Sequence, residues 1–102
     1  MTNRLIAIID DYGTDERVAY KVTTTPYGDS PTSIAVTAFN ITGGSRTDVT
    51  STVLTGTASA TGDVITLPIL HSLTPGGVYR IEVKFTANGN VFEPYIEVQA
   101  KY

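Results

Sequence analysis

The chain has 102 residues, a formal net charge of −3 and no cysteine. This length fits one domain with a single core, because single domains most often have about 100 to 150 residues. The acidic balance lacks the basic stripe that nucleic-acid binding requires, and the absence of cysteine excludes disulfides and thiolate sites. No apolar run approaches the roughly 18 residues of a membrane-spanning helix, so we expect a soluble protein that binds neither nucleic acid nor membrane.

The first half of the chain shows strand patterning that is interrupted by turn residues. Residues 17–25 alternate apolar and polar side chains, which predicts a strand. Residues 26–31 contain prolines, a glycine and an aspartate, which predicts a loop. Residues 32–41 predict a second strand whose apolar parity changes at Phe39, so we expect a bulge near Ala38.

The middle of the chain predicts shorter and less regular strands. The glycines at 43–44 can take the positive φ of a tight hairpin turn, so residues 49–55 are expected to pair back on the preceding strand. Residues 56–62 have only small side chains and predict a loop or a short edge strand. Residues 64–70 predict a strand, but Pro68 cannot donate a ladder hydrogen bond, which indicates an edge position or an irregularity.

The last third of the chain has the clearest pattern. From Val78 the apolar residues alternate strictly with charged ones, and Asn88-Gly89 is a strong hairpin signal before the returning strand, residues 91–100. The side chains expected to face the core from these two strands are Tyr79, Ile81, Val83, Phe85, Phe92, Ile96, Val98 and Ala100.

Short strands at intervals of about 8 to 12 residues, with turn signals between them, are typical of an all-β sandwich or barrel. We favour an antiparallel β-sandwich of about seven strands. Residues 17–102 are expected to form this domain, and residues 1–16 are expected to be either an N-terminal arm or its first strand.

Residues 73–83 resemble the start of strand F in fibronectin type III domains and related immunoglobulin-like sandwiches. The resemblance implies a tyrosine corner, in which Leu73 fills the core, Pro75 and Gly76 turn the chain, and the Tyr79 hydroxyl bonds to backbone a few residues upstream. An immunoglobulin domain proper would have Cys in place of Ile81 and a Trp in the second strand. Their absence favours a fibronectin-like or unclassified variety.

A broader resemblance covers about residues 15–102. The Thr-rich strands, the segment at 61–67 and the terminal hairpin are similar to the small immunoglobulin-like virion proteins of tailed bacteriophages. This resemblance implies a non-enzymatic structural protein of the virion, such as a capsid decoration (cement) protein or a head–tail or fibre-associated subunit. Its implied partners are capsid or tail proteins and further copies of itself.

The alternative is a binding module of a bacterial surface or secreted protein, with a protein or carbohydrate ligand. The chain starts at Met1 and ends at Tyr102 directly after the last predicted strand, which favours a free-standing subunit over such a module. Exposed aromatics such as Tyr27, Tyr95 and Tyr102 suit either function, because they can contact protein or stack on sugar.

We expect no catalytic, cofactor or metal site in this chain. His71 is the only histidine, so it has no partner for a catalytic triad or a metal pair and is interpreted as a loop residue. The acidic cluster of Asp10, Asp11, Asp15 and Glu16 does not have EF-hand spacing and is interpreted as a solvated linker rather than a Ca²⁺ site. The carboxylates on outward strand faces, which could otherwise resemble a glycosidase pair, are Glu82, Glu93 and Glu97.

One segment is singled out for function, the apolar run at residues 3–9. Its apolar side chains are either the first strand of the sandwich or an assembly arm that adds to the open sheet edge of a neighbouring subunit. The residues of this possible arm are Leu5, Ile6, Ile8 and Ile9.

Overall fold

The computed structural model describes residues 5–13, 16–24 and 30–101. Within this part of the chain most residues lie in β-strands, and helix is limited to a 3₁₀ turn, η1 (Thr42–Gly44), and one α-helical turn, α1 (Thr50–Val53). The fold is therefore all-β, as the sequence predicts. Asp15, Tyr27, Tyr102 and most of the predicted loop at 26–31 lie outside the described residues.

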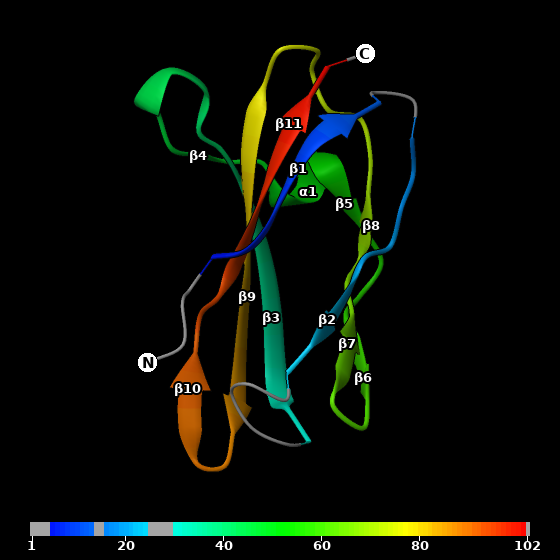
Figure 1. The fold of residues 1–102 in the computed structure, drawn as a ribbon, viewed down its shortest axis with the longest axis vertical. Coiled ribbons are helices and arrows are strands. Elements are labelled where there is room, and N and C mark those ends of the chain that lie inside the picture. Colours follow the sequence, from blue (N-terminus) through cyan, green and yellow to red (C-terminus); the bar gives the residue numbers. More distant parts are fainter. Residues whose placement is uncertain (1–4, 14–15, 25–29, 102) are drawn as a thin grey trace.

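The larger sheet forms one layer of the molecule (Figure 1). Its strands lie in the order β1 (Leu5–Tyr12), β11 (Tyr95–Ala100), β9 (Val78–Ala87), β3 (Thr32–Asn40) and β4 (Thr47–Asp48), and β10 (Asn90–Phe92) also pairs with β9. The pair β1–β11 is parallel, which corrects the expectation of a wholly antiparallel arrangement. After β1 the chain crosses to the other layer instead of turning back, so no hairpin sets the direction of β1.

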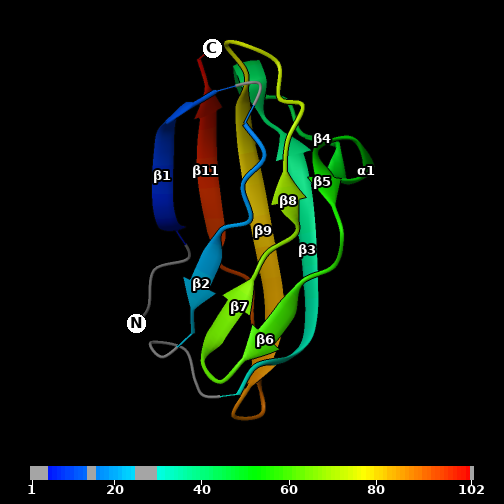
Figure 2. The same ribbon diagram turned by 90° about the vertical axis from the view of Figure 1, so that its right-hand side faces the viewer.

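The opposite layer is made of shorter pieces (Figure 2). One small sheet has the order β2 (Lys21–Thr23), β7 (Val64–Thr66) and β6 (Ser59–Thr61), and a second pairs β5 (Leu54–Thr55) with β8 (Ile69–Leu70). One strand is predicted over residues 17–25, but its described part, residues 17–24, forms only β2 and a single bridge from Val18 to Leu70. The described residues thus contain eleven strand segments where about seven strands were expected.

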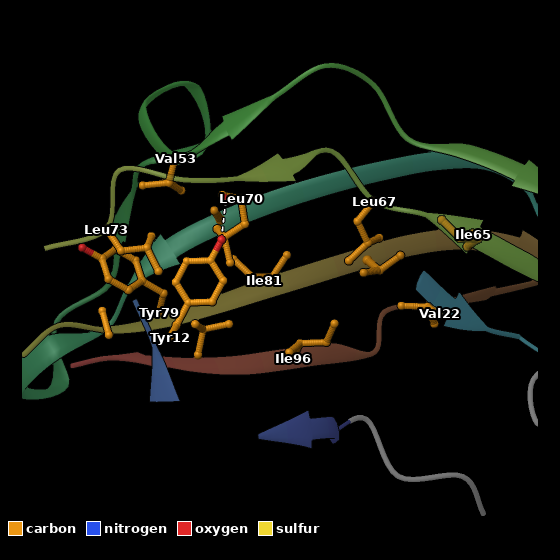
Figure 3. Close-up of a cluster of buried hydrophobic side chains, with 14 of the residues drawn as sticks. Tyr12, Val22, Val53, Ile65, Leu67, Leu70, Leu73, Tyr79, Ile81 and Ile96 are labelled. Atoms are coloured by element: carbon orange, nitrogen blue, oxygen red, sulfur yellow. Dashed lines mark hydrogen bonds between the residues drawn. The ribbon is translucent and has the colours of Figure 1, made fainter. Parts of the chain in front are cut away.

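The core lies between the two layers (Figure 3). Alternate residues of β9 and β11 point into it, as the period-two pattern predicts, and β7, β8 and the following loop supply its other side. Burying each large apolar side chain contributes roughly 1.5 to 3 kcal/mol. The buried apolar residues are Tyr12, Val22, Ala38, Val53, Ile65, Leu67, Leu70, Leu73, Tyr79, Ile81, Val83, Phe85, Ala87, Ile96, Val98 and Ala100.

The hairpin after β9 forms where the sequence predicts it. Asn88 and Gly89 have φ angles of 51° and 78°, and positive φ at both turn residues matches the twist of the flanking strands. Phe92 pairs with Phe85 across the hairpin, with ring centroids 5.8 Å apart. The break at residues 93–94 does not shift the register. Tyr95 follows Phe92 by three residues, and its partner Glu82 likewise precedes Phe85, the partner of Phe92, by three residues.

The prediction of a bulge near Ala38 is wrong. Ala38 and Phe39 pair with consecutive residues of β9, and the irregularity lies earlier, between Thr32 and Ala35. No parity change is needed, because Phe39 belongs to the outer face of the sheet and is covered there by the Arg46 guanidinium, 4.1 Å from its ring centroid.

The prediction of a strand over residues 49–55 is also wrong for most of that range. The glycine turn is present, but the returning strand is the two-residue β4, and α1 follows it. The Asp48 carboxylate accepts hydrogen bonds from the Thr50 amide (3.0 Å) and hydroxyl (2.7 Å). This local side chain to backbone bonding competes with a ladder and starts a helical turn.

The remaining irregular segments agree with the sequence. β6 is a short edge strand of its sheet, and Pro68 separates β7 from β8. A proline there removes a ladder donor, so the apolar stretch divides into two strands that belong to different sheets.

Candidate interaction surface

The edge of the larger sheet at β1 is the most exposed apolar surface among the described residues. β1 pairs with β11 on one side and is the end strand of the sheet, so its other side faces no strand of the described chain. Leu5, Ile6 and Ile8 are 38%, 37% and 54% exposed, and Val91 is the one other large apolar residue of the described chain that is comparably exposed. We call the unpaired side of β1, with Leu5, Ile6 and Ile8, the β1 edge.

Cross-strand pairing shows which face these side chains take. Ala7 and Ile9 pair with the buried residues Ile96 and Val98, whereas Ile8 pairs with Glu97 on the outer face. Ile9 is accordingly half-buried and packs against the core. Of the four predicted arm residues, the structure therefore leaves Leu5, Ile6 and Ile8 exposed and turns Ile9 inward.

The centre of the outer face is covered by its own side chains. The Arg80 guanidinium lies 3.8 Å from the Tyr95 ring centroid, and Arg46 lies over Phe39 in the same way. Glu82 Oε2 is 3.2 Å from Arg46 Nη2 and 3.0 Å from Arg80 Nε, although the Arg80 pair does not have the angle of a hydrogen bond. Each such cation–π contact contributes about 0.5 to 1 kcal/mol at an exposed site. The aromatic rings at the centre of the outer face are thus covered by arginines, whereas the apolar side chains of the β1 edge are exposed.

Tyr12 holds the end of β1 to both layers. It is 1% exposed, and its hydroxyl donates a hydrogen bond to the Leu70 carbonyl of β8 in the opposite layer (Figure 3). Its own carbonyl accepts from the Lys101 amide after β11, at 3.0 Å. Burial raises the pKa of Tyr12 to about 12 and also raises that of the neighbouring Tyr20. The phenol is therefore neutral at ordinary pH and acts as a donor.

This position of β1 bears on the arm hypothesis. In the single chain, β1 completes the larger sheet of its own domain and is fixed at its end by Tyr12. Transfer of the same segment to a neighbouring subunit is not tested by the structure of one chain and stays a prediction. The division of the chain at residue 16 likewise stays a prediction.

The residues of the predicted tyrosine corner lie close together. Leu73 and Tyr79 are buried, Gly76 has a φ of 80°, and the Tyr79 hydroxyl accepts a 2.9 Å hydrogen bond from the Thr74 amide. Pro75 is exposed in the turn. A Cβ on Gly77 would lie 2.9 Å from the Tyr79 ring, so a residue without a side chain is needed there. These contacts join the turn to the start of β9.

The other sequence candidates remain dispersed. The two ring nitrogens of His71 contact the Thr55 and Ser72 hydroxyls, and no carboxylate contact of this ring is seen in the described chain. Glu82 is engaged by arginines, and Glu97 lies on β11. Glu93 lies in the break between β10 and β11, so its expected position on a strand face is wrong. Among the described residues no group of three His, Asp or Glu side chains is arranged around a metal site, and no pocket is found.

Sequence reasoning missed two features of this surface. Tyr12 is not among the predicted core residues, because Asp10 and Asp11 separate it from the apolar run that ends at Ile9. The pairing of Arg46 with Phe39 had no local signal, because the two residues meet only when the hairpin brings β4 beside β3.

The sequence matches no protein-family model, and no curated protein is significantly similar to it. In the part of the chain that the structure describes, neither short helix has the length and apolar character to span a membrane.

Proposed function

We propose that this protein is a non-enzymatic structural subunit of a tailed-bacteriophage virion that acts through protein–protein contacts. The observation that carries the proposal is the β1 edge, where three large apolar side chains lie exposed along an unpaired strand. Exposed apolar strands of this kind are a liability for an isolated domain, since they template pairing with another chain. A subunit whose role is assembly has a use for such an edge.

An immunoglobulin-like sandwich is the fold that suits the strand order best. In variable-type immunoglobulin domains one sheet contains strands G, F, C and C′, and the other contains B, E and D. The orders β11-β9-β3-β4 and β2-β7-β6 correspond to these two sets. Tyr79 then lies near the start of strand F, where a tyrosine corner belongs. β1 pairs beside G rather than beside B, unlike the first strand of a constant-type domain.

The virion as the location is supported by the resemblance of the Thr-rich strands and terminal hairpin to small phage proteins of this class. Within the virion we favour capsid decoration, with attachment at the head–tail junction or fibre as the related alternative. The partners are then capsid or tail proteins and further copies of the chain.

The direct test is to purify particles from a host that carries this gene and to quantify the protein in them by mass spectrometry against the major capsid protein. We expect a fixed ratio of this chain to capsid protein that survives high-salt washing, and particles lacking the gene should be less resistant to heat or shear. Absence from the particles, with the protein found instead at the bacterial surface or in the medium, would favour a binding module and contradict the proposal.

A further inference from the structure

We propose that the turn of the β9–β10 hairpin is a site of spontaneous covalent modification, in which the Asn88 side-chain amide becomes a carboxylate through a cyclic imide formed with the Gly89 backbone nitrogen. The co-reactant is water from the solvent. This inference goes beyond the proposed function and does not depend on it. Its consequence is one additional negative charge at the hairpin end of the larger sheet (Figure 1).

The reaction has two balanced steps. In the first, the Gly89 nitrogen attacks the carbonyl carbon of the Asn88 side chain, a C–N bond forms, and the bond from that carbon to the side-chain nitrogen breaks. Ammonia leaves and takes the proton of the Gly89 amide with it. In the second, water adds to either carbonyl of the imide and one C–N bond breaks. The product has an aspartate at position 88, or an isoaspartate whose backbone runs through the former side chain.

The sequence directs this chemistry to one asparagine. Asn88 is followed by glycine, whereas the other asparagines, at positions 3, 40 and 90, precede an arginine, an isoleucine and a valine. A side chain on the following residue crowds the attacking nitrogen, most strongly where it branches at Cβ, and glycine has no side chain. Asparagine is one of the thermolabile residues of proteins. Asn88 is therefore the asparagine that we expect to react first.

The surroundings of the turn favour the reaction. Asn88 and Gly89 are both exposed, so water reaches them. The last ladder pair of the hairpin joins Ala87 to Asn90, which leaves the two turn residues outside the ladder. Asn88 has a φ of 51°, a left-handed conformation that L residues adopt at a steric cost. The reacting pair is thus solvated, strained and not held by strand pairing.

The folded turn nevertheless keeps the reacting atoms apart. For an L residue with positive φ the allowed ψ is about +30° to +60°. The Cβ of Asn88 and the Gly89 nitrogen then lie nearly opposite each other about the Cα–C bond, whereas the cyclic imide requires them on the same side. The hairpin must therefore open locally before the imide forms, and the frequency of this opening sets the rate.

The contact of Phe92 with the core restrains this opening. β10 has three residues, and Asn90 and Val91 are exposed. Phe92 packs against the core, with its ring centroid 5.8 Å from that of Phe85. Short segments with few buried contacts open locally at a lower free energy than the whole domain unfolds. The hairpin can therefore open while the core stays intact, and Phe92 controls how often it does so.

The test is peptide mapping by mass spectrometry of the purified chain after incubation at mildly alkaline pH, with fragmentation to separate positions 88 and 90. We expect conversion at position 88 to be many-fold faster than at positions 40 and 90. It should accelerate as the pH rises, because the nitrogen attacks as its anion. Enzymatic methylation of isoaspartate should label the product, and ion exchange should resolve it by its additional negative charge.

Variants test the two parts of the proposal separately. In the urea-unfolded chain, where strain of the turn plays no part, Gly89→Ala should slow conversion several-fold because its methyl group crowds the nitrogen. In the folded chain, Phe92→Ala should speed conversion several-fold by releasing β10. Val91→Thr, which keeps a β-branched residue at an exposed position of the same strand, is the matched control and should react at the wild-type rate. Melting curves show that each variant is folded.

Conversion at position 88 that is no faster than at positions 40 and 90 would overturn the assignment of the site, as would an undiminished rate in urea-unfolded Gly89→Ala. The requirement for local opening has its own test in the wild type, which should react faster in urea than when folded. Equal rates in the two states, or a Phe92→Ala rate equal to that of Val91→Thr, would overturn this requirement.

Discussion

The two layers of this domain are held together in different ways. In the larger sheet, β9 and its neighbours pair in long, regular ladders, and every second side chain of β9 and β11 is buried. In the opposite layer no strand of the described residues exceeds three residues. Its short ladders are supplemented by isolated bonds such as Thr24 N–H to the Asp63 carbonyl (2.7 Å) and His71 N–H to the Val53 carbonyl (2.9 Å). The larger sheet is specified by a repeated alternation of buried and outward side chains, and the opposite layer depends more on individual contacts.

If this contrast is correct, the largest effect of a substitution should come from the regular layer. Ile81→Ala removes a buried side chain at the centre of β9, and we expect it to lower the free energy of unfolding by about 2 to 5 kcal/mol through lost burial and the cavity left behind. Chemical denaturation measures this, with the exposed Val91→Ala as control, expected within about 0.5 kcal/mol of wild type. A wild-type melting temperature in Ile81→Ala would show that β9 is assigned to the wrong face.

The next effect should come from the link between β3 and α1. The buried Ala38 amide donates a 3.0 Å hydrogen bond to the Thr50 hydroxyl. Thr50→Val keeps the shape but leaves this amide without its partner, so we expect a loss of about 1 to 3 kcal/mol. Thr50→Ser retains the hydroxyl and should lose much less. Equal losses in the two variants would mean that the methyl group, and not the bond, stabilises the turn.

Tyr12→Phe should have a smaller effect, because the Leu70 carbonyl keeps a second donor in the Val18 amide at 3.2 Å. We expect a loss of about 0.5 to 1.5 kcal/mol at neutral pH, measured by urea denaturation. The variant removes the hydroxyl that bonds to the Leu70 and Glu16 carbonyls, so an unchanged stability would show that these bonds do not anchor the end of β1.

The pH dependence of stability in the same variant tests whether the Tyr12 phenol is buried and neutral. With a folded pKa of about 12 and an unfolded value near 10, wild-type Tyr12 keeps its proton in the folded state while the unfolded state ionises. The contribution of Tyr12 to stability is constant below about pH 10 and falls as the pH rises toward 12, by up to about 1.4 kcal/mol per pH unit. Tyr12→Phe should lack this component of the slope. Parallel slopes between pH 9 and 11.5 would contradict the buried neutral phenol.

The smallest loss of stability should come from a substitution on the outer face of the larger sheet. Arg46→Ala removes an exposed ion pair to Glu82 and the stacking on Phe39, and exposed contacts of this kind contribute about 0 to 1 kcal/mol. We expect a loss in that range that shrinks at high salt, measured by thermal melting. A loss comparable with that of Ile81→Ala would mean that the surface cluster is part of what holds the sheet.

The same contrast explains what the sequence could predict. The alternation from Val78 onward, the Asn88-Gly89 turn and the interruption at Pro68 follow from local rules, and the structure agrees with each. The change of parity at Phe39 predicts a bulge near Ala38, and this prediction fails because Phe39 lies on the outer face, where Arg46 covers its ring. α1 was missed because Thr50 and Val53 have strand propensity, and only the bonds to Asp48 reverse it.

The candidate surface could be predicted only in part. The apolar run beginning at Leu5 is visible in the sequence, but its parallel pairing with β11 depends on residues more than eighty positions away. The burial of Tyr12 under β8 depends equally on the assembled layers. Local patterns therefore identify the segment, and the tertiary structure decides which of its sides is open.

Hydrogen exchange along Leu5–Tyr12 tests most directly whether β1 is a strand of its own domain, with one side paired to β11 and the other side open. Successive amides of a regular strand point to opposite sides, and the pairing of β1 with β11 is regular from Ala7 to Ile9. We expect the amides of β1 that face β11 to exchange slowly and those on the open side to exchange rapidly. Uniformly rapid exchange along β1 would show a detached arm and contradict this pairing.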